Sequence, residues 1–170
     1  VTNSSTGEIL AMVSKPDFNP EEIEAIWDDL IKDDESSVLL NRVTQGLYPP
    51  GSTFKIITAL EYMRQNPDSY SNYSYQCNGS ITRGEDRIQC YHGSVHNSVG
   101  FTKSFAKSCN TSFANIGLSL DRDAFGNTLN KLLFNRELML SMPYTQSSVP
   151  VSSDTTDSDM MQISIGQGAA

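Results

Sequence analysis

Ser52 and Lys55 lie three residues apart at the start of an apolar segment. The turn residues Pro49, Pro50 and Gly51 come directly before them, and such residues can begin a helix but rarely continue one. Both side chains are therefore expected on one face of a helix N-terminus, within reach of each other. A serine becomes a nucleophile when a base removes its proton, and a lysine can be that base when burial and positive potential lower its pKa. The same spacing also suits a helix-capping serine beside a solvated lysine.

A second polar cluster is Ser108-Cys109-Asn110, which lies between partly apolar stretches of helical character. Ser108 and Asn110 can point to one side of a short bend while Cys109 turns into the packing. A buried polar cluster needs hydrogen-bond partners, and Lys55 is a candidate for that role. The alternative is an ordinary helix-capping turn.

Hydrophobic periodicity predicts that these residues are positioned mostly by helices. An N-cap, a proline and two glutamates at 19–22 predict the start of the first helix, on which Trp27 is expected to anchor the core. The other predicted helices are 52–65, buried on most sides; 101–120, interrupted near 108–110; and 125–138, with Leu129, Leu132, Leu133 and Leu138 facing the core.

Strand and loop signals lie near the two ends of the sequence. Residues 1–14 show a strand–turn–strand pattern, in which a polar turn cluster with a glycine separates two apolar runs. Residues 147–159 are rich in Ser, Thr and Asp and are predicted to form a mobile loop.

Composition limits the possible partners. The chain has 170 residues, enough for one domain with a core, and 38% of them are hydrophobic. Twenty acidic residues against twelve basic ones give a formal charge of −8, which repels a phosphate backbone. Nucleic acid is therefore not an expected partner. No apolar run approaches the length that spans a bilayer.

The cysteines raise the question of a disulfide or a metal site. Cys77 and Cys90 flank a polar, turn-rich stretch that reads as a hairpin whose ends could meet. With His92 and His96 they form a Cys-x12-Cys-x-His-x3-His string, which lacks the close cysteine pair of common zinc sites. The string favours a disulfide or two free thiols with surface histidines, and we expect no metal and no cofactor.

The motifs Ser52-x-x-Lys55 and Ser108-x-Asn110 carry a family resemblance. Together with Asn41-Arg42, Thr6–Met12 and Ile165–Gly168, they resemble the transpeptidase domain of class B penicillin-binding proteins, in the superfamily of penicillin-recognising serine acyltransferases. The resemblance implies an α/β fold of the α+β type, the penicillin-binding-protein/β-lactamase-like transpeptidase fold. Its helical subdomain would make up most of the chain, together with the N-terminal strand pair of the antiparallel sheet. Its parts would be the strand pair at 1–18, a helical region at 19–146 and a return toward the sheet at 147–170.

The resemblance also implies roles for four residues. Ser52 would be the nucleophile that attacks the D-Ala-D-Ala end of a peptidoglycan stem peptide, or a β-lactam, and Lys55 the base that activates it. Ser108 would relay the proton to the leaving amine, and Asn110 would bond Lys55 and the substrate amide. The protein would be membrane-anchored, act at the extracytoplasmic face of a bacterial membrane and work with cell-wall synthesis proteins that set cell shape.

The third motif of this family, Lys-Thr/Ser-Gly, does not occur in the 170 residues. We therefore expect them to be part of a longer polypeptide and inactive alone. Later strands, a second chain or a swapped copy would complete the sheet.

Two alternatives fit parts of the pattern. A class D-like β-lactamase or β-lactam sensor shares the first motif, but those proteins usually carry an aliphatic residue where this chain has Asn110. A catalytically silent binding or scaffold fragment is favoured by the missing third motif.

Overall fold

The computed structural model describes residues 1–33 and 35–168 and divides the chain into two compact units. The first unit comprises Val1–Tyr48 and Leu138–Gln146, and the second comprises Pro49–Glu137 and Ser147–Ala170. Both predicted motifs lie in the second unit. No helix of the described residues is long and apolar enough to cross a membrane.

Among the described residues of the first unit, helix α1 (Ile23–Leu30) follows the 3₁₀ turn η1 (Pro20–Glu22). The predicted start is confirmed, because the side chain of Asn19 accepts a hydrogen bond from the backbone N–H of Glu21. The prediction for Trp27 was wrong: its side chain is 46% exposed within the described chain. The strand pair expected at 1–14 is reduced to a single bridge between Thr2 and Ile9, since two strands without further partners are marginal.

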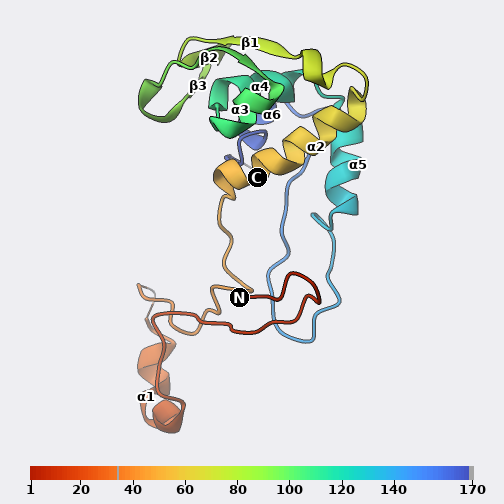
Figure 1. Ribbon diagram of the computed structural model, residues 1–170. Helices are drawn as coiled ribbons and strands as arrows, with labels where there is room; N and C mark the ends of the chain where they lie inside the picture. The colour runs from red at the N-terminus through yellow and green to blue at the C-terminus, as the bar shows by residue number, and fades with distance from the viewer. Residues whose placement is uncertain (34, 169–170) are drawn as a thin grey trace. The chain divides into compact units, whose positions relative to one another are not determined.

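The second unit combines helices with two small antiparallel sheets, which confirms the α+β class (Figure 1). Its elements in chain order are η2 (Gly51–Phe54), α2 (Lys55–Gln65), η3 (Tyr70–Asn72), β1 (Ser74–Cys77), β2 (Ser80–Arg83), β3 (Asp86–Gln89), η4 (Tyr91–Gly93), β4 (Asn97–Gly100), α3 (Phe101–Ala106), α4 (Asn110–Ser119), α5 (Arg122–Lys131) and α6 (Asp157–Ile163). Strand β1 pairs with β4, and β2 with β3, so the hairpin expected between Cys77 and Cys90 is present.

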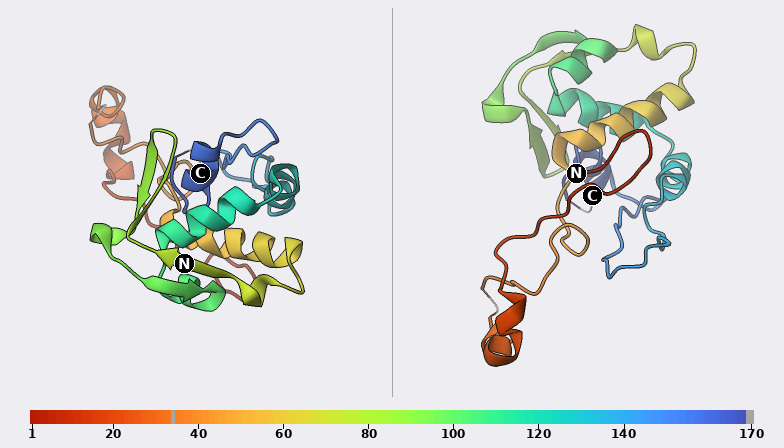
Figure 2. Two further views of the ribbon diagram at one scale, coloured as in Figure 1. Left: turned by 90° about the horizontal axis from the view of Figure 1, so that it is seen from above. Right: turned by 60° about the horizontal axis from the view of Figure 1, so that its bottom comes forward.

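Helix α4 is the centre of this unit, and it packs against α2, α6 and strands of both sheets (Figures 1 and 2). Most of its residues are buried because it has neighbours on several sides, as a helix with small and apolar residues around its circumference requires. One core cluster consists of Phe54, Leu120, Phe125, Leu129, Val149, Met160 and Ile163, and a second of Ala59, Phe101, Phe113, Ile116 and Ile165. Helices α2 and α4 both contribute side chains to the second cluster, and Ile57 and Tyr62 of α2 also pack against the first.

Helix α2 is less buried than its sequence predicted. Ile56 and Leu60 are each about half exposed, whereas Glu61 is fully buried. The Glu61 carboxylate accepts hydrogen bonds from Arg64, Gln65 and Thr128. Burial by itself would raise the pKa of Glu61, but these bonds outweigh it and hold the pKa below its usual value. A charged carboxylate that accepts several hydrogen bonds can thus occupy a buried position of α2 where an apolar residue would be expected.

Two boundaries near the C-terminus also differ from the prediction. Helix α5 ends at Lys131, so Leu132 and Leu133 lie beyond it and are about half exposed. The stretch expected to be a mobile loop is attached at Val149, which is buried and whose backbone N–H and C=O both bond the side-chain amide of Asn135. Its last residues already belong to α6.

A close approach between α5 and the chain at residue 151 gives a test of this packing. A Cβ added at Gly126 would lie 2.2 Å from the carbonyl oxygen of Val151. In an exposed helix Gly→Ala stabilises by about 1 kcal/mol. Here we expect Gly126→Ala to lower the free energy of unfolding by roughly 1–3 kcal/mol, because backbone must move. Urea denaturation measures the change, with the exposed neighbour Asn127→Ala as a control that should be neutral or slightly stabilising. A Gly126→Ala protein as stable as the parent would contradict the packing.

Candidate active site

The turn before α2 presents Ser52 at the surface and sends Lys55 inward. Gly51 has a φ of 58°, in the left-handed region that glycine tolerates, and its N–H donates to the carbonyl of Gly166 at 2.8 Å. A Cβ on Gly166 would lie 2.1 Å from the carbonyl oxygen of Gly51, so the two backbones approach too closely for any larger residue at 166. Ser52 is exposed, and Lys55, the first residue of α2, is 1% exposed.

The second motif occupies the break between α3 and α4. Ser108 has a φ of 49°, an uncommon conformation for a residue with a side chain. Cys109 is the N-cap position of α4 and is fully buried, as the sequence led us to expect. The side-chain amide of Asn110 donates to the carbonyl of Gln89 at 2.8 Å, which attaches the motif to the end of β3.

The two motifs meet at the Lys55 amine. Its Nζ lies 3.3 Å from Ser52 Oγ, 2.9 Å from Ser108 Oγ, 2.8 Å from the Ser108 carbonyl oxygen and 2.6 Å from Asn110 Oδ1. Ser108 Oγ in turn donates to Ser52 Oγ at 3.0 Å. The structure therefore brings all four predicted residues into one hydrogen-bonded group.

The number of oxygens around Lys55 has a chemical consequence. A protonated amine has three N–H donors, but four oxygens surround this one. A neutral amine has two donors and a lone pair, and it can donate to the carbonyl of Ser108 and the amide of Asn110 while a serine hydroxyl donates to the lone pair. The group thus accommodates both protonation states, which a base that takes and returns a proton needs.

The environment of Lys55 favours the neutral state. Burial lowers its pKa to about 8, from an ordinary value of 10.5, while the nearby sulfurs of Cys109 and Cys90 act weakly in the opposite direction. The ring centre of Phe113 lies 5.6 Å from Nζ. At neutral pH a useful fraction of the amine is therefore free to accept a proton, whereas an exposed lysine would offer almost none.

A polar pocket of about 440 Å³ opens beside this group. Ser52, Ser108 and Asn110 form part of its lining, together with Tyr91, Ser94, His96 and Lys107. The sequence analysis did not identify Tyr91, Ser94, Lys107 or the Gln89 carbonyl, and it named His96 only as part of the cysteine–histidine string. A backbone carbonyl has no signal in the sequence, and the loop residues carry no pattern of their own.

The cysteines are arranged differently from the predicted string. Cys77, Cys90 and Cys109 are all free, and His96 joins them in a compact cluster, whereas His92 lies elsewhere. The expectation of surface histidines was therefore wrong for His96, which is half-buried between the cluster and the pocket.

Comparison with known proteins shows the family of this chain. A family model described as "Penicillin binding protein transpeptidase domain" matches residues 1–170. The peptidoglycan D,D-transpeptidase PbpA of Mycolicibacterium smegmatis is 34% identical over 130 residues, covering 70% of this chain and 26% of the relative. Peptidoglycan D,D-transpeptidase MrdA of Escherichia coli is 29% identical over 140 residues, covering 77% and 22%. The chain thus spans about a quarter of the length of these curated relatives.

Solved structures show the same fold. An imipenem acyl-enzyme complex of penicillin-binding protein A from Mycobacterium tuberculosis superposes with a TM-score of 0.82 at 28% identity, covering 96% of this chain and 40% of that one. PBP2 from Helicobacter pylori gives a TM-score of 0.84 at 24% identity, covering 99% and 34%. The chain belongs to the penicillin-binding protein transpeptidase domain family, and the fold predicted from the resemblance is confirmed.

The lowered pKa of Lys55 can be measured directly. In protein labelled with ¹³C at the lysine ε-carbon, we expect one NMR signal to titrate near pH 8, because burial disfavours the ammonium form. Lys55→Met should remove that signal, and the exposed Lys131→Met should leave it in place. If every lysine signal titrated above about pH 10, the ordinary range for this side chain, the amine would not be desolvated as the structure shows.

Proposed function

We propose that this chain carries the acyl-transfer centre of a peptidoglycan D,D-transpeptidase that β-lactams also acylate. The observation that carries the proposal is the contact of Ser52 Oγ with both Lys55 Nζ and Ser108 Oγ. It rests further on the relatives, which are named D,D-transpeptidases, and on the acyl-enzyme complex of the M. tuberculosis protein.

In the proposed first half-reaction, Ser52 Oγ forms a bond to the penultimate D-alanine carbonyl as its proton passes to the neutral Lys55 amine. The bond between that carbonyl and the terminal D-alanine nitrogen then breaks, and the proton reaches the leaving nitrogen through Ser108 Oγ. Asn110 keeps Lys55 in line and offers its amide to the substrate. A β-lactam follows the same path, but its leaving nitrogen stays attached to the acyl group.

In the second half-reaction the amine of a neighbouring stem peptide attacks the Ser52 ester. Its surplus proton returns along the same route to Ser52 Oγ, and a peptide bond replaces the one that was broken. Between the two substrate nitrogens, each proton is carried by Ser52, Lys55 or Ser108 of this chain.

The setting of the activity is part of the proposal. Substrate stem peptides lie outside the cytoplasmic membrane, so the protein would act at the extracytoplasmic face, attached to the membrane and together with other cell-wall synthesis proteins. The class D-like hydrolase or sensor remains the alternative function. A transpeptidase should hold a penicillin acyl group at Ser52 for a long time, whereas a β-lactamase releases it quickly.

Acylation by a fluorescent penicillin tests the roles of the two central residues. On the protein at its natural length, we expect one label per chain, no label on Ser52→Ala and full label on Thr53→Ala, whose hydroxyl donates to the Pro50 carbonyl. Lys55→Ala should slow acylation by roughly 10²–10⁴-fold, the usual contribution of a positioned proton acceptor. Lys131→Ala is the matched control. Full labelling of Ser52→Ala would refute the assignment of Ser52 as the nucleophile. An unchanged acylation rate for Lys55→Ala would refute the assignment of Lys55 as the base.

The pH dependence of acylation gives an independent test. The reactive amine is the neutral form, which is populated above its pKa, so the acylation rate should rise with pH and level off above about 8. In Lys55→Ala the rise through this window should disappear. A wild-type rate that is flat from neutral pH to beyond the pKa of Lys55 would mean that this amine does not accept the proton.

A further inference from the structure

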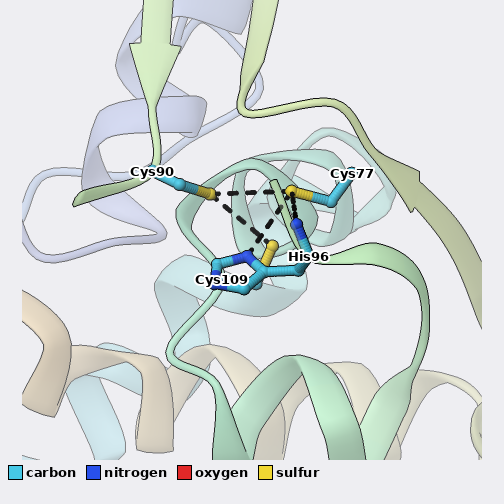
Figure 3. A group of neighbouring side chains, drawn as sticks. All are labelled: Cys77, Cys90, His96 and Cys109. Carbon is cyan, nitrogen blue, oxygen red and sulfur yellow. Dashed lines mark hydrogen bonds between the residues drawn. The ribbon is translucent and has the colours of Figure 1, made fainter. Parts of the chain in front are cut away.

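Three buried thiols and one imidazole converge behind the second motif (Figure 3). The cluster consists of Cys77, Cys90, His96 and Cys109, and their sulfur and nitrogen atoms all lie within 4.8 Å of one another. The four residues come from separate segments: the end of β1, the residue after β3, the loop before β4 and the N-cap of α4. Four separate segments place their sulfur and nitrogen atoms at one point, as residues that bind a common ligand do.

The distances within the cluster match those of a tetrahedral zinc site. Zn–S bonds of about 2.3 Å and Zn–N bonds of about 2.05 Å place two sulfurs about 3.8 Å apart, and a sulfur and a nitrogen about 3.6 Å apart. The Sγ atoms of Cys77 and Cys90 are 3.8 Å apart, those of Cys90 and Cys109 are 3.7 Å apart, and Cys77 Sγ lies 3.5 Å from His96 Nδ1. A disulfide needs about 2.05 Å between two sulfurs, and it would leave the third thiol and the imidazole without a role.

Two hydrogen-bond donors surround Cys77 and suit a thiolate at that position. The buried hydroxyl of Thr111 donates to Cys77 Sγ at 3.2 Å, and the backbone N–H of His96 donates to the same sulfur at 3.5 Å. Donors to the ligand atoms are the usual outer shell of a metal site, since they stabilise the charge on sulfur and hold its position.

We propose that Cys77, Cys90, His96 and Cys109 bind one Zn²⁺ as a structural site. Three sulfurs and one imidazole nitrogen select a soft or borderline cation over Mg²⁺ or Ca²⁺. Four protein ligands complete the tetrahedron and leave no position for a water, so the metal holds the fold and does not activate a nucleophile.

The site has a consequence for the candidate active site, which rests on the proposed function. Cys109 lies between Ser108 and Asn110, and Cys90 follows Gln89, whose carbonyl accepts the Asn110 amide. A metal bound to both cysteines ties the end of β3 to the start of α4. It therefore helps to keep Ser108 in its left-handed conformation and Asn110 against Lys55.

Metal analysis of the wild-type protein is the primary test. The protein at its natural length, purified without chelators, should contain one zinc per chain when its metal content is measured by inductively coupled plasma mass spectrometry. Replacing the zinc with Co²⁺ should produce the intense visible absorption of a tetrahedral, sulfur-rich cobalt centre. The proposal would be overturned if the protein contained no metal, or if it contained iron or copper in place of zinc. A disulfide between any two of these cysteines in a non-reducing peptide map would also overturn it.

Variants assign the ligands, and the second histidine provides a matched control. His96→Ala and Cys77→Ser should lose the zinc and the cobalt absorption, whereas His92→Ala should keep both, because His92 lies outside the cluster. A chelator should lower the melting temperature of wild type and of His92→Ala but leave that of His96→Ala unchanged. Full zinc content in His96→Ala would exclude that residue as a ligand and refute the four-ligand site.

The link to the active site is measured separately. Removing the zinc should slow penicillin acylation roughly tenfold or more, and adding zinc back should restore it, as expected for groups that position a reactive centre. An acylation rate that is the same with and without zinc would refute the link. If Ser52→Ala were still labelled, the proposed function would fail, while the metal content of the protein would stand as its own result.

Discussion

The buried amine of Lys55 is the constraint on which the rest of the second unit depends. Removing an ammonium group from water is costly, and the cost is tolerable because four oxygens from three residues surround the nitrogen and because its pKa falls to about 8. The surrounding backbone must hold those oxygens within hydrogen-bonding distance of the nitrogen. Much of the packing around α2 and α4 serves to position them.

Helix α4 provides most of that accuracy. It lies between α2, α6 and the small sheets, and its buried face leaves little freedom to shift. Its first residue is Asn110, so a well-packed helix fixes one partner of Lys55 directly. The other side is fixed by the close approach of Gly51 and Gly166, which sets the turn that carries Ser52. The Ser52 hydroxyl is thus exposed while the Lys55 amine, three residues away, is buried.

The thiol–imidazole cluster of Cys77, Cys90, His96 and Cys109 and the Lys55 group share the same short segments. Residues 89–90 and 108–110 contribute to both, with alternate side chains pointing to opposite sides of the motif. The strained conformation of Ser108 therefore has a firm support immediately behind it. The outward side chains of Ser108 and Asn110 contact Lys55, and the sulfur of Cys109 points inward to the cluster. His96 belongs to both regions, because it reaches the sulfurs and also lines the pocket.

The sequence alone was sufficient for the features that depend on neighbours along the chain. The cap at Asn19, the interruption of the helix at 108–110 and the proximity of Ser52 to Lys55 follow from local spacing, and the two motifs with their flanking residues were enough to predict the family. The tertiary structure decided what depends on residues far apart in the chain. Glu61 is buried because Thr128 and Arg64 reach it, and Trp27 is exposed although its helix is amphipathic. The sequence analysis expected no metal site, because the string of Cys77, Cys90, His92 and His96 lacks a close cysteine pair. The fold brings in Cys109, 19 residues beyond Cys90, and leaves His92 out, since ligand geometry is set by the packing of separate segments and not by their spacing.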